Sequence, residues 1–463
     1  MSVDTNNAAF QDALNLIQYT RQSVFLTGKA GTGKSTFLRY VCENTKKKHV
    51  VLAPTGIAAI NAGGSTMHSF FKLPFYPLLP DDPNLSLQRG RIHEFFKYTK
   101  PHRKLLEQIE LVIIDEISMV RADIIDAIDR ILRVYSHNLR EPFGGKQLLL
   151  VGDVFQLEPV VKNDEREILN RFYPTPYFFS ARVFGQIDLV SIELQKVYRQ
   201  TDPVFVGVLD HIRNNTAGAA DLQLLNTRYG SQIEESEADM YITLATRRDT
   251  VDSINEKKLA ELPGDPITFE GVIEGDFPES SLPTSQELVL KPGAQIIFIK
   301  NDFDRRWVNG TIGVIAGIDE EEETIYVITD NGKECDVKRE SWRNIRYRYN
   351  EKTKEIEEEV LGSFTQYPIR LAWAITVHKS QGLTFSRVVI DFTGGVFAGG
   401  QAYVALSRCT SLDGIQLKKP INRADVFVRP EIVNFAGRFN DRQAIDKALK
   451  QAQADVQYAA ASR

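Results

Sequence analysis

The first half of the chain alternates short apolar runs with segments of helical periodicity. Each run is followed by a polar or glycine-containing turn, which is typical of strands buried in a parallel sheet. From about Ala122 to Val134, isoleucine and leucine recur at helical spacing and predict an amphipathic helix. This alternation predicts an α/β fold with a parallel sheet. The runs lie at 23–27, 50–53, 111–114 and 147–151.

A second α/β pattern begins near Leu189 and is then interrupted. From about residue 293 to residue 361 the chain carries short β-like runs separated by turn signals such as Asn309-Gly310. The α/β pattern resumes at 369–372. The interruption predicts a small all-β barrel inserted in the second α/β domain.

Composition agrees with a soluble globular protein of several domains. The chain has 463 residues, of which 43% are hydrophobic and 25% charged, and this length predicts two to four domains. No apolar run is long enough to span a bilayer, and the first residues lack a charged and then apolar leader. We therefore expect no membrane association and no secretion signal, and a cytoplasmic or, in a bacterium, nucleoid-associated location.

The net charge of −5 argues against a protein that coats nucleic acid through a bulk positive field. A narrow basic channel stays compatible with it. The stretch 338–349 mixes arginines with aromatic residues, as strand-binding surfaces do, although such a stretch is more often a solvated face. The acidic run 355–359 looks like an exposed hairpin face, and we assign it no function.

Residues 28–35 fit the phosphate-loop pattern G-x-x-x-x-G-K-S, between an apolar run and the helix-like stretch 36–43. Glycines allow a tight turn, so that backbone N–H groups and the N-terminus of the next helix point at phosphates. Lys34 would reach the β- and γ-phosphates, and the Ser35 hydroxyl would bind Mg²⁺. The motif predicts a nucleotide site but leaves open what the hydrolysis drives.

Two further polar groups follow predicted strands. The run 111–114 is followed by Asp115 and Glu116. Asp115 would lie beside Mg²⁺, and Glu116 would polarise the attacking water as general base. Gln156 follows the run 147–151 and would sense the γ-phosphate. A GTPase would also carry an Asn-Lys-x-Asp motif, and the sequence has none.

Together these motifs and four others resemble a superfamily 1 helicase, and more narrowly the petite-integration-frequency (Pif) family of DNA helicases within superfamily 1B. The similarity covers about residues 8–415, and the segment 123–147 matches that family's signature between its second and third helicase motifs. The seven motifs lie in order at 28–35, 53–59, 115–116, 152–160, 197–200, 376–382 and 401–408.

The resemblance implies two RecA-like parallel-sheet motor domains with a small wedge insertion and an inserted SH3-like β barrel. The wedge would include the proline-rich apolar stretch 70–80, which could equally be a loop packed on the core. The expected units are a first motor domain at 1–188 with its wedge at about 64–80, a second at 189–292 and 362–430, the barrel at 293–361, and a helical tail at 431–463.

The resemblance also implies roles for single residues. Arg199 and Arg408 would be arginine fingers that stabilise the charge of phosphoryl transfer when the cleft between the domains closes; an intradomain salt bridge is the alternative for each. The predicted catalytic residues are Lys34, Glu116, Gln156, Arg199 and Arg408. The predicted Mg²⁺ ligands are Ser35 and Asp115. The predicted nucleotide-binding residues are Gln11, Gly28, Ala30, Gly31, Thr32, Gly33, Lys34, Ser35, Thr36 and Gly382.

Within these sets, Gln11 would contact the adenine edge, with an exposed amide as the alternative. The resemblance places the DNA contacts where small residues and backbone amides let a phosphate chain pass closely. His68 and Phe70 would touch sugars or bases, although a lone histidine is more often a satisfied polar residue. The predicted DNA-binding residues are Pro54, Thr55, Gly56, Ser65, Thr66, His68, Phe70, Thr376, His378 and Lys379.

The function implied by the resemblance is an ATP- and Mg²⁺-dependent DNA helicase that translocates 5′ to 3′ on single strands. Its expected partners are single-stranded DNA and forked or structured DNA, with G-quadruplexes and RNA–DNA hybrids among the candidates, and we expect a monomer in solution. Two alternatives stay open. One is an ATP-switched single-strand binding protein without unwinding activity. The other is a metabolic phosphate-loop enzyme, in which 376–382 and 401–408 would have no role.

Overall fold

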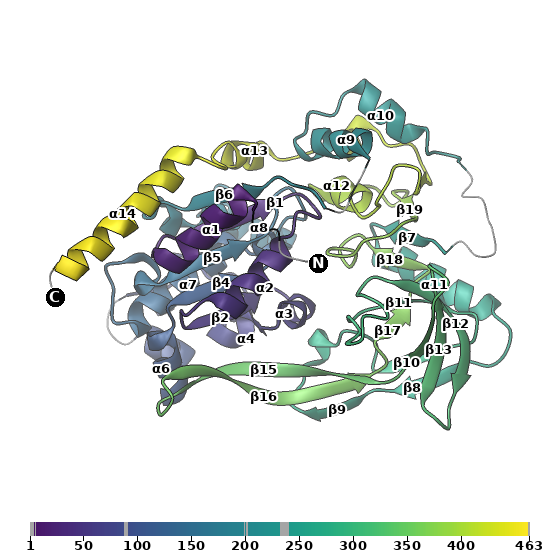
Figure 1. Ribbon diagram of the computed structural model, residues 1–463, viewed down its shortest axis with the longest axis horizontal. Helices are drawn as coiled ribbons and strands as arrows, with labels where there is room; N and C mark the ends of the chain where they lie inside the picture. The colour runs from purple at the N-terminus through teal and green to yellow at the C-terminus, as the bar shows by residue number, and fades with distance from the viewer. Residues whose placement is uncertain are drawn as a thin grey trace.

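A six-stranded parallel sheet forms the centre of the first half of the chain, in the order β3-β2-β4-β5-β1-β6 (Figure 1). The structure, a computed structural model, describes residues 4, 6–87, 91–198, 200, 202–231 and 240–461, with side chains up to residue 451. The predicted parallel α/β fold is confirmed. The strands are β1 (Val24–Gly28), β2 (His49–Ala53), β3 (Ser65–Thr66), β4 (Leu111–Ile114), β5 (Gln147–Val151) and β6 (Val190–Leu194).

Helices cover both faces of this sheet, which is why its central strands are apolar throughout. Alternate residues of β1 enter two different hydrophobic clusters, as the period of two in a strand requires: Phe25 packs with α7, and Leu26 packs with α1 and α2. We call the sheet and these helices the first α/β domain. Its helices are α1 (Ala8–Tyr19), α2 (Lys34–Asn44), α3 (Gly56–Ala62), α4 (Met67–Phe71), α5 (Arg91–Phe96), α6 (Lys100–Gln108), α7 (Ala122–Tyr135) and α8 (Asn163–Leu169).

A second, four-stranded parallel sheet has the order β18-β7-β19-β20. We call it, with its helices, the second α/β domain. Helix α9 packs on α12 through Phe205 and Leu209, so it belongs to the core of this domain. The strands are β7 (Ile242–Ala245), β18 (Ala374–Thr376), β19 (Val388–Asp391) and β20 (Ile415–Leu417). The helices are α9 (Pro203–Arg213), α10 (Ala219–Asn226), α11 (Arg248–Glu261) and α12 (Gln401–Leu406).

Antiparallel strands interrupt the second α/β domain, as the change of pattern along the sequence predicts. A five-stranded sheet in the order β14-β13-β12-β11-β17, a three-stranded sheet β15-β16-β9 and the pair β10-β8 make up this region. Its SH3-like form stays a prediction. The strands are β8 (Ile267–Glu270), β9 (Val272–Gly275), β10 (Glu287–Leu290), β11 (Gln295–Phe298), β12 (Ile312–Asp319), β13 (Thr324–Thr329), β14 (Glu334–Val337), β15 (Glu340–Asn350), β16 (Glu355–Gln366) and β17 (Ile369–Leu371).

The hairpin of β15 and β16 reaches from the antiparallel region to the first α/β domain (Figure 1). The side chains of Ile345, Tyr347 and Tyr349 are buried in the hydrophobic cluster of that domain. The backbone N–H of Val51 donates to the Tyr347 hydroxyl over 3.3 Å, and the Lys48 ammonium lies 5.5 Å from the centre of the Tyr349 ring. One face of the hairpin is therefore an apolar and aromatic contact with β2.

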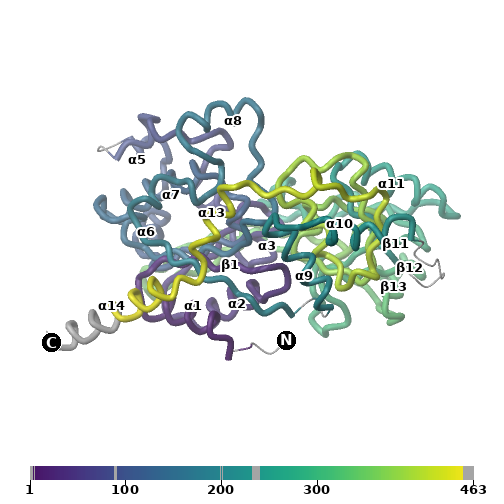
Figure 2. Tube along the Cα trace, turned by 90° about the horizontal axis from the view of Figure 1, so that it is seen from above, coloured from purple at the N-terminus to yellow at the C-terminus, as the bar shows by residue number. Residues whose placement is uncertain are grey.

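The end of the chain returns from the second α/β domain to the first (Figures 1 and 2). Helix α13 (Pro430–Ala436) places Phe435 in a stack on Phe179, with ring centres 4.3 Å apart. Helix α14 (Arg442–Ala461) then packs along α1, burying Ile445, while Arg442 forms a 2.6 Å ion pair with Asp12. Across the described residues, no helix combines the length and the apolarity that crossing a membrane demands.

Candidate nucleotide-binding cleft

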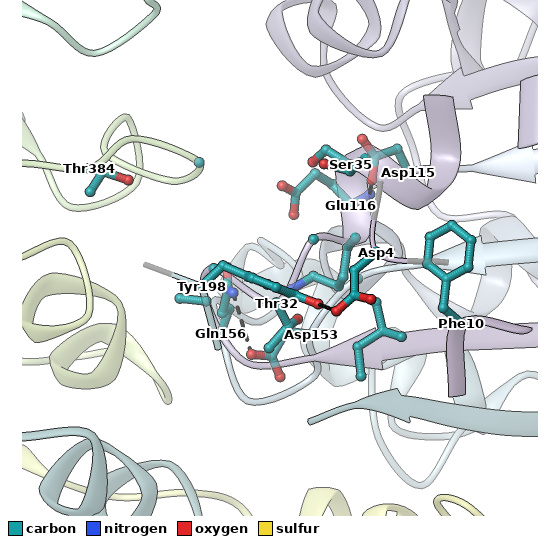
Figure 3. A pocket seen from close by; sticks show the side chains of 18 of the residues that line it. Asp4, Phe10, Thr32, Ser35, Asp115, Glu116, Asp153, Gln156, Tyr198 and Thr384 are labelled. Atoms are coloured by element: carbon teal, nitrogen blue, oxygen red, sulfur yellow. Dashed lines mark hydrogen bonds between the residues drawn. The ribbon is translucent and has the colours of Figure 1, made fainter. Parts of the chain in front are cut away.

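A cavity of about 530 Å³ lies between the two α/β domains, and both domains line it (Figure 3). The predicted nucleotide-binding residues from Ala30 to Thr36 line one side, and Gly382 and Arg408 line the other. The acids Asp115 and Glu116 and the amide of Gln156 also face the cavity. The structure thus brings together residues that are far apart in the sequence.

The phosphate loop joins β1 to α2. Gly31 and Gly33 have positive φ values of 80° and 90°, a conformation that side chains disfavour, and α2 begins directly after Gly33. The Lys34 ammonium donates to the carbonyl oxygens of Gly28 and Lys29, over 2.7 Å and 3.1 Å. A Cβ on Gly28 would lie 2.5 Å from the Thr32 hydroxyl oxygen. This distance is too short for a side chain at position 28, so the position requires glycine. The loop thus has the tight turn, followed by a helix N-terminus, that directs backbone N–H groups at phosphates.

The two acids follow β4 at the carboxyl edge of the sheet. The N–H of Glu116 donates to Asp115 over 2.9 Å, and Glu116 has a left-handed φ of 50°, which is uncommon for a residue other than glycine. Burial, together with the neighbouring carboxylate of Asp115, raises the pKa of Glu116 to about 7. Burial also raises the pKa of Asp115. A carboxylate whose pKa lies near 7 is suited to general-base catalysis at neutral pH.

Gln156 lies where the first α/β domain meets the second. Its side-chain amide donates to Asp153 over 3.4 Å, and its side-chain oxygen lies 3.5 Å from the amide nitrogen of Gln381. A Cβ on Gly400, at the start of α12, would approach the carbonyl oxygen of Gln156 to 2.3 Å. The segment that holds Gln156 therefore touches the second domain closely.

The structure describes one of the two predicted arginine fingers, Arg408. Arg199 lies outside the described residues. Arg408 lines the cavity but is 1% exposed. Its guanidinium donates to the carbonyl oxygens of Val404 over 3.0 Å and of Leu383 over 3.3 Å, and to the Ser407 hydroxyl over 3.0 Å. The second domain thus holds Arg408 rigidly at the cavity wall.

The far end of the cavity has lining residues that motif analysis did not predict. Asp4, Asn7 and Phe10 come from the N-terminal segment and α1, and Tyr198 comes from the segment after β6. The Tyr198 hydroxyl donates to the Asp4 carboxylate over 2.8 Å (Figure 3). Tyr198 belongs to the motif at 197–200, which was a usable signal, whereas nothing in the sequence marks Asp4. Gln11 follows Phe10 on α1 and is not among the cavity-lining residues.

Several of the DNA-binding candidates in the first domain lie at the starts of helices. Pro54 directly follows β2, and the side chains of Thr55 and Thr66 cap α3 and α4. Gly56 has no room for a side chain, because a Cβ there would meet the Ser281 hydroxyl at 2.4 Å. Ser65, in β3, is buried.

In the second domain, the Thr376 hydroxyl accepts from the N–H of Lys379 over 3.2 Å. Burial lowers the pKa of both His378 and Lys379. These side chains are therefore held in partly desolvated positions at the end of β18. Their contact with DNA stays a prediction.

The predicted wedge divides into a buried and an exposed part. Phe70 is 4% exposed and packs against Phe71 and Tyr347, so its ring does not reach the surface. Phe75 is 85% exposed, and its ring stacks in parallel on His68 with centres 5.0 Å apart. The stretch thus has an apolar part packed on the core and an exposed part that carries the rings of Phe75 and Tyr76, and its role as a wedge stays a prediction.

Known proteins resemble the chain over nearly its whole length. Residues 4–212 match the family model of PIF1-like helicases. The ATP-dependent DNA helicase Pif1 of Campylobacter jejuni is 34% identical over 414 residues, which cover 85% of this chain and 88% of that protein.

Two solved structures of Bacteroides sp Pif1 are similar in different degrees. The complex with ADP-AlF4 has a TM-score of 0.85 at 42% identity, covering 93% of this chain and 96% of that one. The form bound to ssDNA has a TM-score of 0.66 at 41% identity, covering 94% and 97%. Identity and coverage are nearly equal in the two comparisons, whereas the TM-score is lower for the ssDNA-bound form.

Proposed function

The chain belongs to the PIF1-like helicase family and is an ATP-dependent DNA helicase, and from this premise we propose that it moves 5′ to 3′ along a single DNA strand by closing its two α/β domains on ATP. The observation that carries the proposal is the shared cavity, to which one domain supplies the phosphate loop and acids and the other supplies Gly382 and Arg408. Nucleotide binding there would draw the two domains together. Hydrolysis would release them.

The residues around the acids fit a magnesium ion. Ser35 and Asp115 line the same cavity and offer a hydroxyl and a carboxylate, which are hard oxygen ligands of the kind that Mg²⁺ prefers. Burial of Asp115 and Glu116 without a cation is unfavourable, since it raises the pKa of each. When bound, Mg²⁺ supplies positive charge to the β- and γ-phosphates. Ser35 and Asp115 would hold it.

The remaining groups divide the chemistry between them. Glu116 accepts the proton of the attacking water, Lys34 neutralises the phosphates, and Gln156 orients water or the γ-phosphate. Arg408 supplies positive charge from the second α/β domain, and we assign the same role to Arg199. Phosphoryl transfer gathers charge on the equatorial oxygens, so these groups act fully only when the cleft is closed.

The strand would cross both α/β domains. Pro54, Thr55 and Gly56 offer one contact in the first domain, and Thr376 to Lys379 offer another in the second. If ATP changes the distance between these two sites, alternate release moves the strand. The TM-score of 0.66 against the ssDNA-bound relative, compared with 0.85 against the ADP-AlF4 complex, supports a rearrangement of domains when a strand binds. We propose single-stranded and forked DNA as partners of a monomer.

We test this proposal with duplexes that carry a single-stranded tail at either the 5′ or the 3′ end. We expect ATP- and Mg²⁺-dependent strand release from the 5′-tailed duplex, and none from the 3′-tailed one. Release from the 3′ tail alone would contradict the polarity. Strong strand-stimulated ATP hydrolysis without any release would instead support a switch that binds strands without unwinding. The Glu116→Gln variant serves as the control for release that does not depend on hydrolysis.

A further inference from the structure

Helix α9 connects the core of the second α/β domain with two parts of the nucleotide site in the first. Its apolar face, with Phe205 and Leu209, packs in the second domain. Its polar face carries Asp210 and Arg213, which are three positions apart and therefore on the same side of the helix. Asp210 forms an ion pair with Lys29 of the phosphate loop.

Arg213 makes the deeper of the two contacts. Its side chain is 3% exposed and donates to Asp153 over 3.1 Å, and its guanidinium also lies 2.8 Å from Glu193 in β6. The guanidinium carbon lies 4.2 Å from the centre of the Phe155 ring. Both carboxylates and the ring belong to the first domain, so a buried cation of one domain is held entirely by groups of the other. Such a charge is stable only while its partners stay in place.

The partner Asp153 is itself bonded to the predicted γ-phosphate sensor. One carboxylate oxygen of Asp153 accepts from Arg213, and the other accepts from the Gln156 amide over 3.4 Å. Gln156 and Asp153 line the nucleotide cavity, whereas Arg213 is not among its lining residues. Arg213 therefore reaches the γ-phosphate end only through Asp153.

We propose that Arg213 is a positioning residue that orients Gln156 through Asp153 and so makes hydrolysis depend on the placement of α9. The inference rests on the proposed role of Gln156 at the γ-phosphate. It differs from the role of the arginine fingers, because Arg213 does not line the nucleotide cavity. A rotation of the second α/β domain that shifts α9 would displace Asp153. The Gln156 amide, which is bonded to Asp153, would then turn away from the water that attacks the γ-phosphate. The same shift of α9 would also displace Lys29 of the phosphate loop, because Asp210 is paired with it.

The principal test is Arg213→Lys, which keeps the charge but replaces the planar guanidinium with a compact ammonium, so that Asp153 and Glu193 are no longer held in the same geometry. We expect the kcat of strand-stimulated ATP hydrolysis to fall by about tenfold to a hundredfold, because a small misplacement of a catalytic group has this effect. The KM for ATP should change by less than about threefold, since the phosphate contacts remain. A parental kcat would overturn the inference.

A matched control separates positioning from a loss of stability. Arg133 is also buried, and it pairs with Asp129 over 2.8 Å within α7, away from the cavity. Arg133→Lys should lower the melting temperature as Arg213→Lys does but leave kcat within about twofold of the parent. Equal losses of kcat in the two variants would overturn the inference. If Arg213→Lys does not fold, Glu193→Gln replaces it. We then expect a smaller decrease in kcat, and an unchanged kcat would overturn the inference.

The route through Gln156 is tested with a double-mutant cycle. If Arg213 acts on Gln156, the variant Arg213→Lys with Gln156→Ala should be no slower than Gln156→Ala alone. Independent, multiplying losses would overturn the route. Strand release by the parent protein from the 5′-tailed duplex tests the proposed function separately, so that failure of the function and failure of this inference give different results.

Discussion

The nucleotide cleft and the β15–β16 hairpin both place acids beside basic groups, but they differ in how far those groups are removed from water. In the hairpin, Arg346 pairs with Glu359 over 2.8 Å, with side chains 57% and 38% exposed. In the cleft, Arg213 and Asp153 are 3% and 1% exposed. Solvent screens the first pair, whereas the second pair interacts at low dielectric.

The difference explains why similar residue types have different consequences. Exposed ion pairs across two strands contribute little to the free energy of unfolding. The hydrogen bond from Arg346 also holds the pKa of Glu359 below its ordinary value. Burial in the cleft raises the pKa of Glu116 instead. Removal of these charged groups should therefore have smaller effects where the group is more exposed to water.

The largest effect is expected from the groups that act on the phosphates. Lys34→Ala and Glu116→Gln should each lower strand-stimulated ATP hydrolysis by at least about a hundredfold, because Lys34 neutralises phosphate charge and Glu116 accepts the proton of the attacking water. Strand binding, measured by fluorescence anisotropy of a labelled oligonucleotide, should be largely unchanged. Parental hydrolysis in either variant would refute the role given to that residue.

The second effect is the pH dependence that Glu116 imposes. With its pKa raised by burial to about 7, Glu116 is protonated and inactive as a base at lower pH. The kcat/KM for ATP should therefore fall by about tenfold per pH unit below pH 7 and level off above it. A profile that stays flat down to pH 5.5 would show that another group limits the reaction.

The same raised pKa has a consequence for stability with the opposite sign. Between the ordinary value of 4.5 and about 7 the folded protein holds more protons on Glu116 than the unfolded chain does. Stability therefore falls as the pH rises through this range, and Glu116→Gln should remove the fall. In thermal melts without Mg²⁺, the melting temperature of Glu116→Gln should rise relative to that of the parent protein between pH 5 and pH 8.

An intermediate effect is expected where a pair is half-buried. Arg429 lies 2.8 Å from Glu158, and their side chains are 37% and 10% exposed. Tyr177 also donates to Glu158 over 3.1 Å. Arg429→Ala should lower the free energy of unfolding by about 1 kcal/mol, less at high salt. Urea titrations at two salt concentrations measure this.

The smallest effect is expected on the hairpin. Arg346→Ala should change the free energy of unfolding by less than about 1 kcal/mol and leave ATP hydrolysis unchanged, because both partners stay hydrated. The matched variant is Tyr347→Ala, which removes a buried ring from the contact with β2 and should be far more destabilising. A larger loss for Arg346→Ala than for Tyr347→Ala would reverse the comparison.

Local patterns predicted the parts of the molecule that depend on local structure. The phosphate loop, the acids after β4 and the helix α7 follow from spacing and periodicity, and the structure places each where the pattern indicates. The burial of Phe70 and the exposure of Phe75 do not follow from sequence, because the two aromatic residues lie in one apolar stretch and only tertiary packing separates them.

Arg213 was missed for a similar reason. It has no neighbouring motif, and its importance comes from Asp153 and Glu193, which approach it only after both α/β domains have folded. The tail shows the same limit, since the sequence predicts a helical tail at 431–463 but not its contact with α1. Sequence patterns describe elements well, whereas contacts between domains depend on the whole fold.

The return of the C-terminal segment has a mechanical consequence. The chain leaves the first α/β domain after β6 and comes back at α13, where Phe435 stacks on Phe179. The second α/β domain is therefore joined to the first by two separate connections of the chain. A second connection allows the two domains fewer relative movements than a single linker would, so we expect it to limit the directions in which ATP binding can displace the second domain.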